Sequence, residues 1–421
     1  MQLTEHPLRR QVVGEMHLRR WPRLTAPAQI VQILRIVPQS DRAAERAMLN
    51  ALPMGGHLAP SDNPRHAEGD LAPGLAFAWE QHSEACGITL FIRDPDVDAT
   101  PALEWLESFP GQTIRATRIV VVADEVEAEA LLPHLDFVGS DLISCYIGGA
   151  TLAHPVRVWS DFRVGPDGLG LAVIAANGAP SGDLARLLQR FQELGNYRNL
   201  ALMGLPTAQA HWPRLDAAEA ALRQLAADVA TPEITDDALL DQVSSLSLDL
   251  MTLSTETNYR MSATAAYAQL VEERLSGLTA RPIPGYPSLE DFTQRRLLPA
   301  IRTAQAYSRR LDDLTTRAGH FTSLLRTRIE TRIENQNARL LRSMERSSSL
   351  QLRLQQLVEG LSVVALSYYG ISLIGYMLKA AEHRFEHFPA AEIIGLLVPV
   401  VIIVLWLGLH RMKARLLAEE E

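Results

Sequence analysis

The stretch LSVVALSYYGISLIGYML at residues 361–378 contains no charged residue, and it decides how the rest of this chain is interpreted. A second uncharged stretch, IIGLLVPVVIIVLWLGL, follows at residues 393–409. A helix needs roughly 20 apolar residues to cross about 30 Å of hydrocarbon, and each stretch approaches that length. Two buried helices of a soluble core would have a similar composition, but the adjacency of the two stretches favours a pair of transmembrane helices.

The distribution of basic residues predicts the orientation of this pair. Basic residues flank it on both sides, at Arg339, Arg342, Arg346, Arg353, Arg411, Lys413 and Arg415. The connecting loop has only Lys379 and Arg384, which stand among glutamates. Because cytoplasmic flanks are enriched in Lys and Arg, we expect both termini in the cytoplasm and the loop on the outer side. The first residues do not resemble a secretory signal, so the prediction is a multi-pass protein of a bacterial inner membrane.

Small and polar side chains follow one face of the first span. The residues are Val358, Ser362, Ala365, Tyr369, Ser372 and Tyr376, and successive members are alternately four and three residues apart. Residues at this spacing share one face of a helix. Hydroxyl groups in hydrocarbon are costly unless they are hydrogen-bonded, so this face is expected to meet other helices or a water-filled path. Helix packing and pore lining both remain open at this point.

The part of the chain before the membrane has the composition of a globular cytoplasmic protein. The 421 residues are 47% hydrophobic and carry a net charge of −9, which is not the balance of a nucleic-acid-binding protein. Only two cysteines occur, Cys86 and Cys145, and both stand in apolar runs. We therefore expect neither a disulfide framework nor a cysteine-based zinc site. We also expect this part of the chain to lie in a reducing compartment. The lipid bilayer is the partner that the sequence identifies, while protein partners stay unknown.

Hydrophobic periodicity predicts an α+β protein. Strands are expected at residues 29–37, 75–80, 87–93, 117–122, 142–148, 156–164 and 169–175. Helices are expected between some of them, at 42–52, 101–108 and 125–134. The predicted order is an α/β cytoplasmic domain (1–178), a helical region (181–287), a long stalk or coiled-coil helix (288–356), a transmembrane hairpin (357–410) and a basic then acidic cytoplasmic tail (411–421).

The predicted stalk helix has one apolar stripe that needs a cover. Its positions are Leu311, Leu314, Ala318, Phe321, Leu325, Ile329, Ile333 and Leu340. The remaining positions are too polar for a buried helix, so the stripe must pack against the preceding antiparallel helix or against the same helix of neighbouring subunits. The second arrangement predicts a homo-oligomer.

Two clusters of histidine and glutamate are candidate metal sites. In the loop between the spans, Glu382 and Glu386, and His383 and His387, are each four residues apart and would share a helix face. Imidazole and carboxylate at that spacing can hold a zinc-like ion, although a solvated loop with local ion pairs has the same composition. A divalent metal ion is the one cofactor that these residues suggest.

The second cluster lies in the predicted cytoplasmic domain. Glu80, His82 and Glu84 are expected to share one side of a strand, and His6, Glu15 and His17 form a further group near the N-terminus. They would form a metal site or an acid/base pair if the two segments adjoin, and ordinary surface polarity otherwise. Asp161 and Arg163 in VWSDFRV favour a structural ion pair. The sequence contains no GxxxxGK[ST], GxGxxG, HExxH or GxSxG motif, so it favours a protein that is not an enzyme.

Several segments resemble the bacterial domain-of-unknown-function family 3422, which is described as membrane-anchored. They include EHPLRRQVVGEMHLRRWP, WEQHSE, VWSDFR, NYRNLALMGLP, NYRMSATAAY and RLQQLVEGLSVVALSYYGISLIGY. The resemblance covers essentially the whole chain and implies an uncharacterised membrane protein, without a mechanism.

The order of elements also resembles the CorA-type divalent-cation channels. That resemblance implies an α/β cytoplasmic domain, a very long helix that enters the first span, a short outer loop and a second span. Those channels carry Gly-Met-Asn at the outer end of the first span, where this chain has Gly375, Tyr376, Met377, Leu378 and Lys379. A lysine there would repel cations. The leading hypothesis is a CorA-like oligomeric membrane protein with a role in ion transport, and the alternative is a membrane-anchored scaffold.

Overall fold

The computed structural model describes residues 4, 6–15, 20–61, 63–149, 152–231, 233–382 and 389–417. The chain divides into two compact units, Met1–Thr322 and Ser323–Glu421. The first unit contains a mixed sheet and several helices, and the described elements of the second unit are helices. The predicted α+β class is confirmed.

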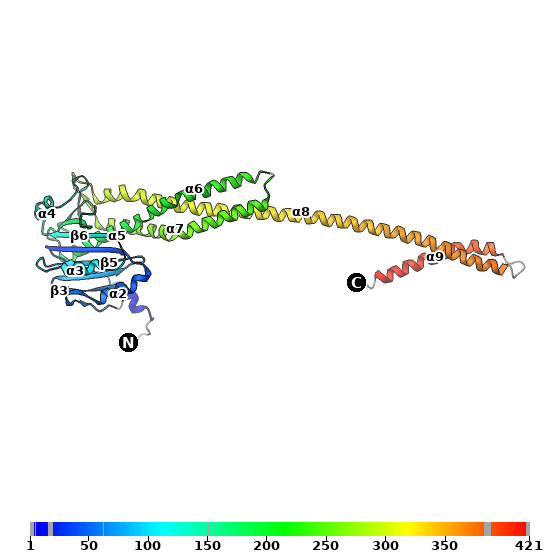
Figure 1. The fold of residues 1–421 in the computed structure, drawn as a ribbon, viewed down its shortest axis with the longest axis horizontal. Helices are drawn as coiled ribbons and strands as arrows, with labels where there is room; N and C mark the ends of the chain where they lie inside the picture. The colour runs from blue at the N-terminus through cyan, green and yellow to red at the C-terminus, as the bar shows by residue number, and fades with distance from the viewer. Residues whose placement is uncertain are drawn as a thin grey trace. The chain divides into compact units, whose positions relative to one another are not determined.

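The first unit is built around a ten-stranded sheet (Figure 1) with the strand order β10-β7-β8-β9-β6-β1-β5-β4-β3-β2. The strands are β1 (Ala28–Ile36), β2 (His57–Leu58), β3 (His66–Ala72), β4 (Leu75–Gln81), β5 (Ala85–Ile92), β6 (Gln112–Val122), β7 (Ile143–Ile147), β8 (Val156–Ser160), β9 (Gly170–Ala175) and β10 (Arg281–Pro282). Strands β6 and β9 pair in parallel, and the other paired strands are antiparallel.

Both faces of the central strands are buried. On β1, Ile30 and Leu34 belong to one apolar cluster, whereas Val31 and Ile33 belong to the other, because successive side chains point to opposite faces. The cluster around Val31 includes helices α2 (Arg42–Asn50) and α3 (Thr100–Glu107). The cluster around Ile30 includes α5 (Ser181–Leu202), α7 (Asp236–Leu278) and the start of α8 (Leu289–Glu382). The sheet is therefore covered by helices on both faces.

The remaining helices of the first unit are α1 (Arg9–Glu15), α4 (Glu125–Leu131) and α6 (Gly204–Asp228). The sequence predicts a break at Pro206, but the interruption between α5 and α6 falls at Met203. Pro206 instead lies in the first turn of α6, where its missing N–H is not needed. Helix α7 begins at a capping residue, since Thr235 Oγ1 accepts a hydrogen bond from Ala238 N at 3.2 Å.

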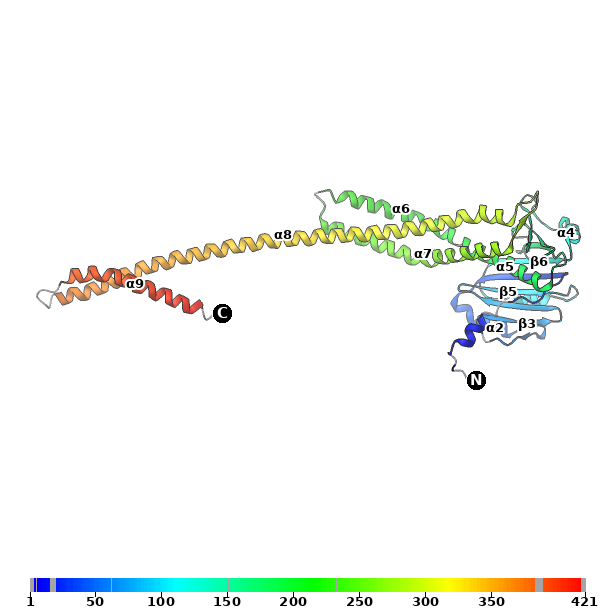
Figure 2. The same ribbon diagram turned by 180° about the vertical axis from the view of Figure 1, so that it is seen from behind.

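The beginning of α8 lies beside α6 and α7 in both views (Figures 1 and 2). Arg310 on α8 pairs with Asp216 on α6 at 2.6 Å, and the Tyr307 ring lies 6.1 Å from that of Trp212. Leu311, Leu314 and Ala318 are buried as a result. For this part of the predicted stripe, the cover is the preceding helices of the same chain.

Several details differ from the sequence-based expectation, which also did not include the short strands β2 and β10. The strand expected at 156–164 ends at Ser160, because Phe162 has a φ of 53°, which a strand cannot accommodate. Strand β3 was not expected, because HAEGDLA has few apolar residues. It lies next to the edge strand β2, where a strand needs less apolar surface.

The second unit consists of the C-terminal part of α8 and helix α9 (Ala390–Leu417). The two segments run antiparallel, and the first part of α9 lies beside the end of α8 (Figures 1 and 2). Pro399 lies within α9. The two uncharged stretches of the sequence therefore form a helical hairpin.

Candidate functional site

Helices α8 and α9 are both long and apolar enough to cross a membrane, by length and composition. Their most apolar windows have mean hydropathies of 1.6 and 2.5. Only 6% and 0% of the residues in these windows are buried within the chain. A core helix of a soluble protein would be mostly buried, so the exposure of both windows separates them from ordinary core helices.

The two helices of the hairpin contact one another through small residues of α8. A Cβ atom built on Gly370 would lie 3.8 Å from Val401 Cγ1, and one built on Gly375 would lie 3.6 Å from Ile394 Cδ1. Ser367, one turn before Gly370, is only 4% exposed. Small residues let two helices approach closely, which is the usual way that helices pack in a bilayer.

The sequence-predicted stripe lies on the other side of α8. Tyr369 and Tyr376 are 67% and 74% exposed, and Val358 is 57% exposed. Ser362 and Ala365 are also exposed, and Ser372 is half-buried. Each residue advances a helix by about 100°, so Tyr369, two residues after the buried Ser367, points away from α9. The stripe is therefore not covered by the hairpin itself.

The same spacing continues in both directions beyond the span. Towards the N-terminus it passes through Gln355, Gln351, Ser348, Met344 and Leu341, and towards the C-terminus it reaches Lys379. From Leu341 to Tyr376 every position of this series is uncharged. Charged residues are nevertheless frequent in this part of α8, and all of them lie off the stripe: Arg342, Glu345, Arg346, Arg353 and Glu359. We call the series from Leu341 to Lys379 the axial stripe.

The candidate metal ligands of the loop are placed only in part. Helix α8 ends at Glu382, whose side chain lies outside the described structure, as do His383, Glu386 and His387. Within the described ranges, no three His, Cys, Asp or Glu side chains come together as a metal site.

The sequence predicted that Glu80, His82 and Glu84 lie along one strand, and this prediction is wrong. Strand β4 ends at Gln81 and β5 begins at Ala85, so His82 and Glu84 lie in the hairpin turn. His82 Nε2 is 3.8 Å from Glu80 Oε2. Glu84 instead pairs with Arg260 on α7, whose Nη1 donates to Glu84 Oε1 at 2.9 Å. His17 and the Glu15 side chain lie outside the part of the chain that the structure describes. His6 lies within it, and its Nδ1 accepts a hydrogen bond from Leu8 N.

The pair expected between Asp161 and Arg163 is also rearranged. Arg163 Nε donates to Asp141 at 2.8 Å, and Asp161 accepts backbone hydrogen bonds from Val138 and from Arg163 itself. The positive φ of Phe162 turns the two side chains apart.

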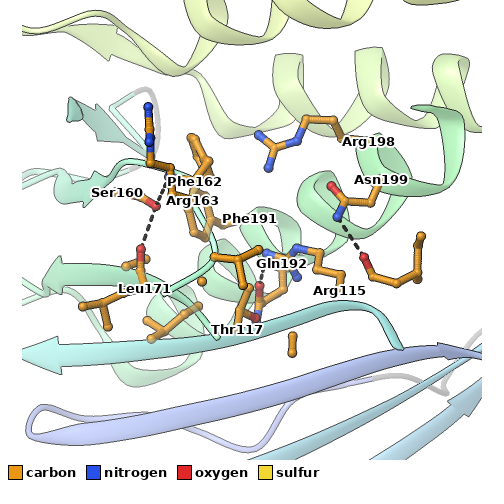
Figure 3. Close-up of a pocket in the computed structure, with 16 residues that line it drawn as sticks. Arg115, Thr117, Ser160, Phe162, Arg163, Leu171, Phe191, Gln192, Arg198 and Asn199 are labelled. Carbon is orange, nitrogen blue, oxygen red and sulfur yellow. Dashed lines mark hydrogen bonds between the residues drawn. The ribbon is translucent and has the colours of Figure 1, made fainter. Parts of the chain in front are cut away.

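A pocket in the first unit brings together two buried arginines (Figure 3). It has about 530 Å³ of empty space, part of it open to solvent, and it is lined by β6, the end of β8, the connection between β8 and β9, the start of β9, and α5. Arg115 comes from β6 and Arg198 from α5, and they are 9% and 8% exposed. All residues that line the pocket, among those the structure describes, are neutral or basic.

Arg115 is held entirely by neutral amides. Its Nη1 donates to Asn196 Oδ1 at 2.8 Å, and its Nη2 donates to Gln192 Oε1 at 2.7 Å. Gln192 is fixed in turn by Thr117 Oγ1 at 2.7 Å. Burial, together with the positive charge of the nearby Arg198, lowers the pKa of Arg115 to about 9. The amides orient the guanidinium without neutralising its charge.

Arg198 is less well satisfied. Its guanidinium carbon lies 4.3 Å from the centre of the Phe162 ring and 5.4 Å from that of Phe292. Among the described residues, its buried Nη1 has no hydrogen-bond partner. Burial lowers its pKa to about 10. Figure 3 shows its side chain extending from α5 towards the pocket. Cation–π contacts stabilise such a group only in part, so one donor remains available.

Sequence reasoning missed Arg115 and Arg198 as site residues. The available signal was an arginine on the apolar face of a helix, since Arg198 stands in NYRNLALMGL beside the buried Leu200 and Ala201. That segment drew attention only for its family resemblance, and VWSDFR, which provides Ser160, Phe162 and Arg163, only for the resemblance and for the expected Asp161–Arg163 ion pair; the two segments meet at this pocket.

Comparison with known proteins places the chain in a family without supplying an activity. No curated protein and no solved structure matches it. The match to a family extends over residues 4–416 and therefore covers both units. The chain belongs to the family described as "Protein of unknown function (DUF3422)".

Proposed function

We propose that this chain is an integral membrane protein that assembles around α8 into a homo-oligomer, with a path for ions along the axis. The single observation that carries the proposal is the axial stripe, which is uncharged from Leu341 to Tyr376 and faces away from α9. In this account the hairpin crosses the inner membrane of a bacterium, and both termini lie in the cytoplasm.

The exposure of the hairpin supports membrane insertion. Large apolar side chains such as Leu361, Leu373 and Leu396 are 73%, 66% and 77% exposed. Water does not tolerate an apolar surface of this extent, whereas hydrocarbon does. The arginines of α8 before the first apolar stretch and the basic residues Arg411, Lys413 and Arg415 near the C-terminal end of α9 favour cytoplasmic flanks.

A second copy of the same helix is the occupant that best fits the axial stripe. The hydroxyl groups of Tyr369 and Tyr376 are unfavourable against lipid and need a polar neighbour. The stripe repeats every seven residues, which is the period at which identical helices pack in parallel. From Leu341 to Tyr376 the stripe is uncharged, so identical faces can meet there without repulsion, although arginines are frequent elsewhere on the helix.

Disulfide cross-linking tests this assembly directly. Ser362→Cys places a thiol on the stripe, and Val364→Cys places one two residues away, at a position that is 67% exposed. Oxidation of native membranes is expected to join Ser362→Cys protomers and to leave Val364→Cys monomeric. Equal cross-linking of the two variants, or none in either, would contradict the proposed packing.

A membrane-anchored scaffold is the second candidate function. The observation that favours it is Lys379, which ends the axial stripe with a positive charge and opposes cations at that end. In a scaffold the stripe packs tightly and no ion passes, so cross-linking would be the same but ion flux would be absent.

A further inference from the structure

We propose that the pocket between β6 and α5 binds a small molecule that carries an oxyanion, a phosphate or carboxylate group, and that Arg198 is its principal ligand. The inference goes beyond membrane insertion and assembly, since it concerns the first unit alone. It rests on three observations: two buried arginines lack a carboxylate partner in the pocket lining, Arg198 Nη1 has no hydrogen-bond partner among the described residues, and the pocket lies beside it.

The charge balance of the pocket is the first step. Two guanidinium groups are buried within one site, and the neighbours that hold Arg115 are the amides of Gln192 and Asn196. A buried cation is ordinarily paired with a carboxylate, because its desolvation is otherwise not compensated. An anion that enters the pocket would provide the missing negative charge.

The second step is the availability of a donor. Arg198 Nη1 is buried and has no partner in the described part of the chain, while the rings of Phe162 and Phe292 hold the guanidinium in place. The planar guanidinium fits the oxygen pairs of phosphate and carboxylate, and bonds of this type are charge-assisted and strong. Preorganisation by the two rings reduces the entropy lost when a ligand binds.

The third step is the chemistry of the remaining wall. Phe162, Phe191 and Leu171 provide apolar surface beside Arg198, and Ser160 and Asn199 provide polar groups. Ser160 and Asn199 already donate to the carbonyl oxygens of Leu171 and Ile114, so they shape the wall. We therefore expect a ligand with two different ends. Its charged end contacts Arg198, and its apolar end contacts Phe162 and Leu171.

Binding of inorganic phosphate to the full-length protein in detergent tests the proposal. Phosphate at several times its Kd is expected to raise the Tm by about 2–4 °C relative to potassium chloride at equal ionic strength. Phenyl phosphate is expected to reach the same shift at a lower concentration, because its ring can contact the apolar wall. Benzoate in a parallel titration distinguishes a carboxylate site from a phosphate site.

The variant Arg198→Met removes the guanidinium but keeps an unbranched side chain beside the Phe162 and Phe292 rings. It is expected to lose the phosphate-dependent shift and, in phosphate-free buffer, to be at least as stable as the wild type, because an unpaired buried charge is removed. The matched control is Arg190→Met on the same helix, where the exposed guanidinium donates to Gly277 O. That variant is expected to retain the shift.

The outcomes separate an anion site from a packing role. If phosphate, phenyl phosphate and benzoate leave the wild-type Tm at the value found in potassium chloride, the proposal is wrong, whatever the variants do. A phosphate shift of equal size in Arg198→Met and wild type would also overturn it, since general salt effects would then explain the shift. Loss of the shift in Arg198→Met alone, with Arg190→Met unchanged, supports it.

Discussion

Ser367 and Tyr369 lie on opposite sides of α8, although only one residue separates them. Ser367 is 4% exposed on the side where Gly370 and Gly375 meet α9, whereas Tyr369 is 67% exposed on the other side. The hairpin thus uses one face of this apolar part of α8 for its own packing and leaves the axial stripe uncovered. The proposed assembly depends on this division of the helix surface.

Ion passage is expected to respond to two residues of the axial stripe. Tyr369→Ala widens the path by removing an aromatic ring, and Lys379→Asn removes the positive charge at its end. Both changes are expected to increase flux of Mg²⁺ or Zn²⁺ into liposomes that contain the protein.

The control for the flux measurement is Val364→Ala, which changes an exposed apolar side chain off the stripe and should leave flux unchanged. Absence of flux in the wild type and in both stripe variants, in preparations that still cross-link at Ser362→Cys, would favour the scaffold function instead.

Gly195 is expected to be intolerant of substitution. A Cβ atom at this position would lie 2.5 Å from Arg115 Nη2, and the Arg115 guanidinium is fixed by Gln192 and Asn196. Gly195→Ala should therefore reduce stability by roughly 1–3 kcal/mol through steric overlap. At Gly319 on α8 an added Cβ would meet nothing within 4 Å, so Gly319→Ala should raise the stability by up to about 1 kcal/mol. Thermal unfolding followed by circular dichroism compares the two, and equal effects would argue against the packing described around Arg115.

The ion pair between Glu84 and Arg260 is expected to stabilise the first unit. Their side chains are only 7% and 16% exposed, and the pair joins the β4–β5 turn to α7. Glu84→Ala leaves a nearly buried guanidinium without its carboxylate, which should cost about 3 kcal/mol. Arg317→Ala removes an exposed partner of Asp313 and should cost about 0.5 kcal/mol. The Tm of each variant in detergent measures the difference. A similar small decrease in both would contradict the structural role of Glu84.

Both cysteines are expected to be unreactive in the folded protein. Burial raises the pKa of the Cys86 thiol to about 12, assisted by Glu45, and burial raises that of Cys145 to about 11. Because the thiolate is the reactive form, maleimide at pH 8 should label neither residue in the native state and both after denaturation. Mass spectrometry of the labelled protein gives the number of modified cysteines. Rapid labelling of Cys145 in the native protein would show that β7 is less well packed than described.

The sequence alone predicted most of the architecture, for identifiable physical reasons. The long uncharged runs at 361–378 and 393–409 and the strong periodicity of β1, β5 and β9 identify those elements without tertiary information. Strand β3 and the end of β8 at Ser160 were missed because a polar strand near an edge and a positive φ at Phe162 depend on neighbouring structure.

The arginine pocket was beyond sequence reasoning for a related reason. Arg115 and Arg198 are far apart in the chain, and only the packing of α5 on β6 places them in one cavity. The axial stripe, in contrast, is a local property of one helix. Its spacing was therefore visible in the sequence at Ser362, Ala365, Tyr369, Ser372 and Tyr376. That it faces away from α9 could be learned only from the packing of Ser367 and Gly370 in the structure.

The mass of the detergent-purified protein is the most direct test of self-association through α8. Light scattering or native mass spectrometry of the wild type is expected to give a closed assembly of several protomers, because a central axis lined by one helix per subunit requires a ring. A monomer or a dimer over the whole range of detergent and protein concentrations would contradict the axial assembly and, with it, the path for ions.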